Sequence, residues 1–122
     1  VCDLRPDVAR AAADRHGVRC YRSEAELLAD PAVDAVVLAT PAAAHRAGVE
    51  AALAAGKHVF VEKPLADTLD DARAVAAAAA RHPGRVVQVG FCERFNPSHL
   101  EARRAARRLG RRVVGVEAEE RY

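Results

Sequence analysis

The chain has 122 residues, about the size of one domain, and its 51% hydrophobic and 30% charged composition is that of a globular protein rather than a disordered one. A formal net charge of +2 is too small to favour nucleic acid or an anionic membrane surface as a partner. No apolar run approaches the roughly 18 residues of a membrane span, so we expect no membrane insertion.

The first residues, Val1-Cys2-Asp3, are typical of the end of a strand, and no Met precedes them. We therefore expect a fragment of a longer protein. The three cysteines, Cys2, Cys20 and Cys92, are odd in number and have no CxxC spacing. This pattern predicts neither a disulfide framework nor a metal site, and it fits a reduced, cytoplasmic protein.

Five short apolar runs alternate with longer helix-favouring stretches. Because the runs are β-branched and nearly continuous, they are predicted to be strands buried on both faces. They cover residues 18–21, 35–39, 59–61, 86–89 and 113–116. The stretches between them are about 10–15 residues long, which is typical of βαβ units. The pattern predicts a doubly wound, parallel α/β sheet of the Rossmann type.

Helix boundaries also have sequence signals. Pro6 suits a first helical position, Ser23 with Glu26 matches a capping box, and Thr68 with Asp71 is a weaker version of it. Glycines suited to a left-handed position follow four helical stretches, at Gly17, Gly56, Gly84 and Gly110. Within residues 67–82, the spacing predicts an apolar face made of Leu69, Ala72, Ala76 and Ala79.

Ligands of such sheets bind at the carboxyl ends of the strands, so polar residues there are the candidates for function. Asp3 ends the short apolar segment at the start of the chain. A carboxylate at the end of the second strand of a dinucleotide-binding fold accepts hydrogen bonds from the adenosine ribose hydroxyls and repels a 2′-phosphate. The alternative for Asp3 is a residue at the entry of a helix. The chain contains no GxGxxG sequence, and we expect that glycine turn to lie before residue 1.

Lys63 is the candidate acid/base. It and Lys57 are the only lysines among 19 lysine and arginine residues, and lysine, unlike arginine, can give up its proton when desolvated. Pro64 restricts the backbone of Lys63 and directs its side chain at the sheet edge; the Lys63–Pro64 bond is also a candidate for the cis form. The alternative is a surface lysine without a role.

Two further groups have less specific signals. His45 lies at the start of a helix, where phosphates bind, and the alternative is a half-exposed histidine. His58 lies within a strand and is predicted to be structural. The arginines of residues 103–112 predict a solvated helix face or an ion network in preference to nucleic-acid binding.

Residues 55–64, Ala-Gly-Lys-His-Val-Phe-Val-Glu-Lys-Pro, closely resemble the Gfo/Idh/MocA oxidoreductases, the relatives of glucose–fructose oxidoreductase and inositol dehydrogenase. The likeness extends to Thr40-Pro41 with His45, to residues 86–91, and to Arg94-Phe95-Asn96-Pro97. It implies a Rossmann domain that binds NAD or NADP, followed by an α/β substrate domain. It also implies hydride transfer between the nicotinamide and a hydroxyl-bearing carbon of a small-molecule sugar, cyclitol or sugar nucleotide.

The resemblance assigns roles to single residues. Lys63 would contact the reacting hydroxyl and assist proton transfer, and Glu62 would lie beside the nicotinamide ribose. Ala42 stands where the family often has Asn. Asp3 predicts NAD in preference to NADP, although Arg5 nearby could accept a 2′-phosphate. The full set expected at the cofactor is Asp3, Thr40, Pro41, His45, Glu62, Lys63, Pro64 and Arg94.

The expected domains are a partial NAD(P)-binding domain at residues 1–110 and the first strand of the substrate domain at residues 111–122. In the strand order 3-2-1-4-5-6, the absent first strand would lie between the short apolar segment that ends at Asp3 and the strand at 35–39. We expect the whole protein to be a homo-oligomeric enzyme and the fragment alone to be inactive. The alternative is a non-catalytic dinucleotide- or sugar-sensing regulator of the same fold.

Overall fold

The computed structural model describes residues 1–108. They belong to two compact units, Val1–Gly90 and a second unit that begins at Phe91. The predicted domain boundary at residue 110, the cap at Gly110 and the strand at 113–116 lie outside the described residues. Within the described part, no helix is long and apolar enough to cross a membrane.

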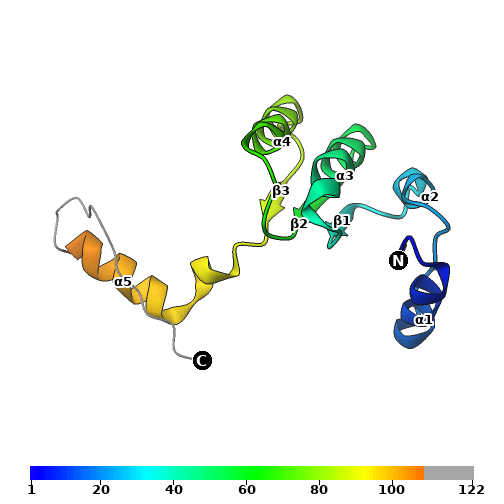
Figure 1. Ribbon diagram of the computed structural model, residues 1–122, viewed down its shortest axis with the longest axis horizontal. Helices are drawn as coiled ribbons and strands as arrows, with labels where there is room; N and C mark the ends of the chain where they lie inside the picture. The colour runs from blue at the N-terminus through cyan, green and yellow to red at the C-terminus, as the bar shows by residue number, and fades with distance from the viewer. Residues whose placement is uncertain (109–122) are drawn as a thin grey trace. The chain divides into compact units, whose positions relative to one another are not determined.

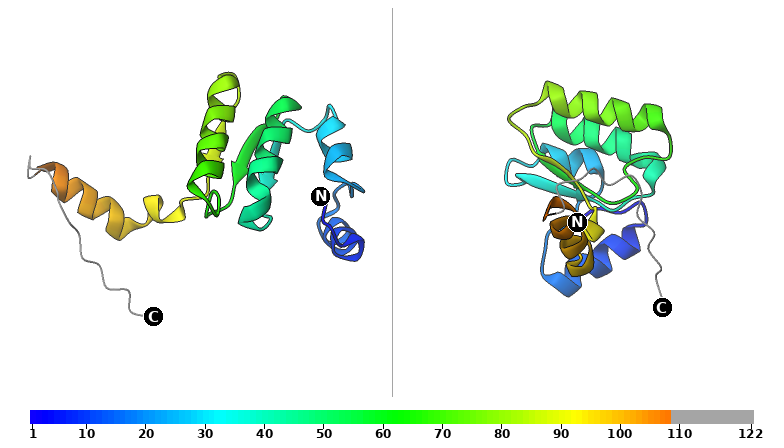
Figure 2. Two further views of the ribbon diagram at one scale, coloured as in Figure 1. Left: turned by 45° about the horizontal axis from the view of Figure 1, so that its top comes forward. Right: turned by 90° about the vertical axis from the view of Figure 1, so that its left-hand side faces the viewer.

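The first unit is built around a three-stranded parallel sheet in the order β1 (Ala35–Leu38), β2 (His58–Val61) and β3 (Val87–Val89). Helix α3 (Ala42–Ala54) connects β1 to β2, and α4 (Leu69–Arg81) connects β2 to β3. The two helices lie side by side over the sheet in Figures 1 and 2. The predicted parallel α/β architecture is therefore confirmed.

The core lies between the sheet and these two helices. Val36, Val59 and Val61 point into it from the strands, and Val49 and Leu53 of α3 are fully buried against them. Fully burying side chains of this size stabilises the fold by about 1.5–3 kcal/mol each. The expectation that every strand is buried on both faces is wrong for β1. There burial alternates, and Val37, on the opposite face, is 71% exposed, because α3 packs on the face of Val36 and leaves the other face of β1 open.

The run at residues 18–21, predicted as a strand, is extended without forming one. The amino group of Val1 donates to the carbonyl of Arg19 (2.6 Å), and the Tyr21 N–H donates to the carbonyl of Val1 (2.8 Å). These two hydrogen bonds hold the segment beside the first residues of the chain in a parallel arrangement. The pairing is too short to count as a strand.

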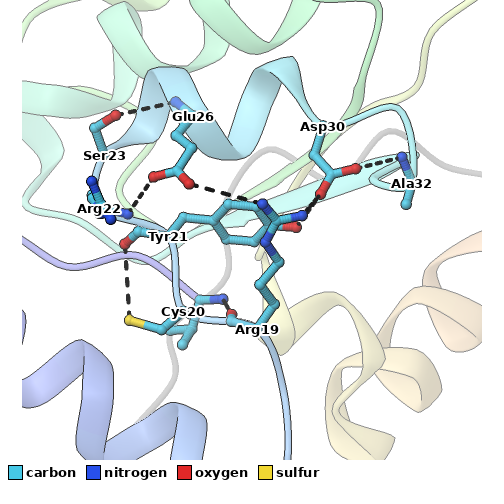
Figure 3. A network of polar contacts seen from close by, with 9 residues as sticks. Arg19, Cys20, Tyr21, Arg22, Ser23, Glu26, Asp30 and Ala32 are labelled. Atoms are coloured by element: carbon cyan, nitrogen blue, oxygen red, sulfur yellow. Dashed lines mark hydrogen bonds and ion pairs between the residues drawn. The ribbon is translucent and has the colours of Figure 1, made fainter.

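Asp30 is the centre of a polar network that fixes this region (Figure 3). Its carboxylate accepts hydrogen bonds from the Ala32 N–H (2.8 Å) and the Tyr21 hydroxyl (2.8 Å), and it pairs with the Arg19 guanidinium (2.6 Å). Arg19 also lies 4.7 Å from the centre of the Tyr21 ring. The hydrogen bonds from Ala32 and Tyr21 lower the pKa of Asp30, and the bond to Asp30 raises the pKa of Tyr21.

Most predicted helix boundaries are confirmed. Helix α1 (Pro6–His16) begins at Pro6 and ends before Gly17, whose φ of 63° is left-handed. Helix α2 (Glu24–Ala29) is capped by the Ser23 hydroxyl, which accepts from the Glu26 N–H at 3.1 Å. The Thr68 hydroxyl caps α4 in the same way, accepting from the Asp71 N–H at 3.1 Å. Gly56, with a φ of 72°, follows α3.

Two predictions about α4 are wrong. Gly84 does not form the predicted left-handed cap, since only Gly17 and Gly56 have positive φ among the glycines of residues 1–108; the helix ends at Arg81 with His82 as its cap, because Pro83 disfavours helical geometry at the residue before it. Its buried face is centred on Val75 and Ala78, whereas Leu69 is 64% exposed. In a run of alanines the apolar pattern does not determine which face is buried, and the larger Val75 sets it.

The second unit contains a 3₁₀ turn (Cys92–Phe95) and helix α5 (Pro97–Arg108). The arginines of α5 are exposed, which agrees with a solvated face. Glu101 pairs with Arg104 (2.5 Å) and lies 4.0 Å from Arg108, so the ion pairs form within the helix. Glu117, Glu119 and Glu120, which follow these arginines in the sequence, lie outside the described residues.

Candidate functional site

The carboxyl ends of the three strands meet at one edge of the sheet. The Glu62 N–H donates to the Leu38 carbonyl (2.9 Å), and the Gly90 N–H donates to the Val61 carbonyl (2.8 Å). The ladder thus continues one residue past β2 and β3. This arrangement brings together the segments that follow β1 and β2, which hold six of the eight predicted site residues: Thr40, Pro41, His45, Glu62, Lys63 and Pro64.

Lys63 is exposed at this edge. Its backbone N–H donates to Oε2 of Glu62 at 3.0 Å, and the bond to Pro64 is cis. Among residues 1–108, no side chain or carbonyl forms a hydrogen bond or ion pair with the Lys63 ammonium. The amine is therefore available to a ligand, while the backbone beneath it is held by the neighbouring carboxylate.

Gly90 is a site residue that sequence reasoning did not single out. A Cβ at this position would lie 3.1 Å from Cζ of Phe60 and 3.2 Å from Oε2 of Glu62. Glycine therefore lets the end of β3 approach the Glu62 carboxylate closely. The available signal was a glycine directly after a strand at the carboxyl edge, where a missing side chain permits close backbone approach.

Helix α3 begins at the same edge. Its N-cap is Pro41, which makes no side-chain capping bond, and its first turn contains no acidic residue. The positive end of the helix macrodipole is therefore not compensated by a carboxylate of its own first turn, which favours an electronegative ligand group there. Thr40, exposed, adds a hydroxyl beside it.

His45 lies one turn into α3 and is 1% exposed. Its Nε2 is 2.8 Å from the Thr40 carbonyl oxygen, and its Nδ1 is 3.0 Å from the Pro64 carbonyl oxygen and 3.3 Å from that of Leu65. The sequence-based alternative of a half-exposed histidine is wrong. The ring connects the segment after β1 to the segment after β2, and a direct contact with a cofactor stays a prediction.

The two remaining predicted residues lie elsewhere in the chain. Asp3 is exposed, and its Oδ1 accepts from the Arg5 N–H at 2.8 Å, just before α1. This contact favours the helix-entry interpretation for one carboxylate oxygen, and no residue of 1–108 bonds the other. Arg94 belongs to the second unit, where it lines a shallow cavity of about 340 Å³ with Glu93, His99 and Arg103. Ligand contacts by Asp3 and Arg94 stay predictions.

A family model described as "Oxidoreductase family, NAD-binding Rossmann fold", that of Gfo/Idh/MocA, matches residues 1–91. Over 117 residues the chain is 43% identical to an inositol 2-dehydrogenase/D-chiro-inositol 3-dehydrogenase of Shouchella clausii, covering 94% of this chain and 33% of the relative. The chain spans about a third of the length of the curated relatives it matches.

Solved structures agree with this match. A scyllo-inositol dehydrogenase from Lactobacillus casei, with NAD(H) and scyllo-inositol bound, superposes with a TM-score of 0.80 at 28% identity, over 88% of this chain and 32% of that one. The WlbA dehydrogenase of Bordetella pertussis, in complex with NADH and UDP-GlcNAcA, gives 0.81 at 30% identity, over 88% and 31%. With the matched motifs at the carboxyl edge of a parallel sheet, these likenesses show that the chain belongs to the Gfo/Idh/MocA oxidoreductase family.

Proposed function

We propose that the whole protein is an NAD-dependent dehydrogenase that oxidises a secondary hydroxyl of a cyclitol or sugar. The observation that carries the proposal is the geometry around Lys63. Its amine is exposed and unpaired among residues 1–108, directly after a buried strand, and its backbone is held by Glu62. A general acid/base needs this combination of a free proton-carrying group and a fixed position.

The chemistry divides between the cofactor and this chain. NAD, when bound, accepts the hydride from the hydroxyl-bearing carbon. Lys63 Nζ, as the neutral amine, would take up the hydroxyl proton and become an ammonium as the carbon–oxygen single bond becomes a carbonyl. Arginine could not replace it, since a guanidinium does not release its proton in a protein. Glu62 would accept hydrogen bonds from ribose hydroxyls, and its contact with the Lys63 N–H ties that role to the position of the amine.

The residues at the carboxyl edge fit one half of a dinucleotide. A carboxylate at Glu62, a hydroxyl at Thr40 and the uncompensated start of α3 suit the ribose and polar groups of its nicotinamide side. The 122 residues contain no GxGxxG sequence, so the site in this chain does not include the turn that holds a pyrophosphate in Rossmann domains.

A cyclitol is the substrate class that we favour, because several relatives are named inositol dehydrogenases. The runner-up is a sugar nucleotide, because the stretch Cys92-Glu93-Arg94-Phe95-Asn96-Pro97 resembles family members that act on sugar nucleotides and because one structural relative has such a molecule bound. The other alternative, a ligand-sensing regulator without chemistry, would bind the same molecules without turning them over.

The test is a steady-state assay of the whole protein for NADH formation with myo-inositol, scyllo-inositol, hexoses and UDP-sugars. We expect turnover with at least one inositol and NAD. Turnover only with a UDP-sugar would contradict the cyclitol assignment and leave the dehydrogenase proposal in place. Saturable binding of NAD and an inositol by calorimetry, with no turnover of any compound, would favour the regulator.

A further inference from the structure

We infer that His45 is a positioning residue for Lys63, acting through the carbonyl groups of Pro64 and Leu65. The inference rests on the proposed function, in which Lys63 moves the proton. It assigns His45 a task different from the direct cofactor contact that the sequence predicts. The grounds are its burial, the chemistry of its hydrogen-bond partners and the way in which the Lys63 segment is anchored.

The segment between β2 and α4 is fixed at its two ends. At the start, the Glu62 N–H continues the ladder to Leu38, and at the finish, Thr68 caps α4. Arg46, the neighbour of His45 on α3, pairs with Asp71 of that cap at 3.0 Å. The middle of the segment lies next to Lys63, and its position determines where the amine is held.

His45 holds this middle part. Within residues 1–108, its ring is the only group that hydrogen-bonds the backbone of residues 64–66. Pro64 has no N–H, so its backbone can be held only through its carbonyl oxygen, and that requires a donor. An imidazole N–H at Nδ1, 3.0 Å from that oxygen, meets this requirement from a rigid helix.

The opposite ring nitrogen connects the same ring to Thr40. Its Nε2 lies 2.8 Å from the Thr40 carbonyl, at the entry of α3. A neutral imidazole has one N–H, so it donates to only one of these two carbonyl groups at a time, and because the ring is 1% exposed, water does not substitute for it there. One side chain thus spans the two segments that form the candidate site.

Three variants of the whole protein separate the two contacts. His45→Phe keeps a ring and removes both nitrogens. His45→Asn places an amide where Nδ1 lies and can donate to Pro64, whereas His45→Gln reaches toward the position of Nε2 and can donate to Thr40. We expect kcat to fall by up to about 100-fold in His45→Phe, since small misplacements of reacting groups have effects of this size. The KM for NAD should change little, and His45→Asn should recover more of kcat than His45→Gln.

His58 supplies the matched control. It is the first residue of strand β2, the strand that precedes Lys63, and its Nδ1 accepts from the Val86 N–H at 3.0 Å. His58→Phe therefore removes a comparable bond between side chain and backbone, away from the site. We expect it to lower thermal stability and to leave kcat of the folded enzyme within about twofold of wild type, since it misplaces no reacting group.

A measurement that does not need turnover tests the role of His45 separately from the proposed dehydrogenase activity. By hydrogen exchange, the hydrogen-bonded amides of Glu62 and Lys63 should lose protection in His45→Phe and keep it in His58→Phe, whether or not the wild type has activity. A folded His45→Phe with unchanged exchange would overturn the inference. So would a raised KM for NAD with kcat intact, which would assign His45 to the cofactor, or a better recovery by His45→Gln than by His45→Asn.

Discussion

The two ends of strand β2 each have a lysine next to them, and the two lysines have opposite surroundings. Before the strand, Lys57 is 8% exposed, and its ammonium donates to the Asp30 carbonyl at 2.9 Å. After the strand, Lys63 is exposed, and within residues 1–108 its ammonium has no partner. The first lysine is part of the fold, and the second is available to a ligand.

This difference follows from the direction of a parallel sheet. At the amino end of β2, the Lys57 ammonium donates to the backbone carbonyl of Asp30, whose carboxylate is itself paired with Tyr21 and Ala32. At the carboxyl end, the helices that follow the strands begin, so backbone donors and polar side chains face outward together. A rare residue type is therefore informative only together with its position along the strand.

The largest effect should come from removing the free lysine. In the whole protein, Lys63→Ala should lower kcat by about 10²–10⁴-fold, the usual contribution of a positioned acid/base, with little change in the Kd for NAD. Lys63→Arg should not restore turnover, because the guanidinium keeps its proton. Steady-state kinetics with calorimetry for NAD is the measurement. A loss of kcat below about fivefold, far under that range, would exclude Lys63 as the proton carrier.

The choice between NAD and NADP should depend on the carboxylate of Asp3, just before helix α1. We expect the whole protein to favour NAD over NADP by about tenfold or more in kcat/KM, about 1.4 kcal/mol, because Asp3 would repel a 2′-phosphate. Asp3→Ser should reduce this preference, whereas Asp7→Ser, a change on α1 nearby, should not. An NADP preference in the wild type would contradict this prediction.

The buried lysine should affect stability and not turnover. Lys57→Met keeps an apolar stem and removes the donor to the Asp30 carbonyl, so we expect the free energy of unfolding to fall by about 1–3 kcal/mol. Lys63→Met is the matched control and should unfold like the wild type. Urea denaturation followed by circular dichroism compares the two. If Lys63→Met is the less stable variant, our division of the two lysines is wrong.

The smallest expected effect is on the pH dependence of thermal stability, and it comes from Asp30. Since the pKa of Asp30 is lowered in the fold, its carboxylate stabilises the native state above the ordinary aspartate pKa of about 4. That contribution is lost as the pH falls through the lowered pKa. Asp30→Asn should therefore differ from wild type in thermal stability at pH 7 and approach it at acidic pH. The exposed Asp7→Asn should show no such convergence, and parallel curves for Asp30→Asn and wild type would contradict the prediction.

Much of the site followed from the sequence because it depends on strand ends. The order of apolar runs and helix caps placed Thr40, Glu62 and Lys63 directly after buried strands, and parallel strands bring such residues to one edge by geometry alone. The caps at Ser23 and Thr68 were also predictable, since each is a contact between residues three apart. Local hydrogen bonding needs no knowledge of the rest of the fold.

Other features depend on contacts between residues far apart in the sequence, and only the tertiary structure decided them. The burial of Lys57 requires the carbonyl of Asp30, 27 residues earlier, and the role of His45 requires the carbonyl of Pro64, 19 residues later. Among the alanines of α4, the packing of Val75 against the core selected the buried face. A sequence pattern records which residues are apolar or polar, but a buried polar group is defined by its partner, and the fold supplies that partner.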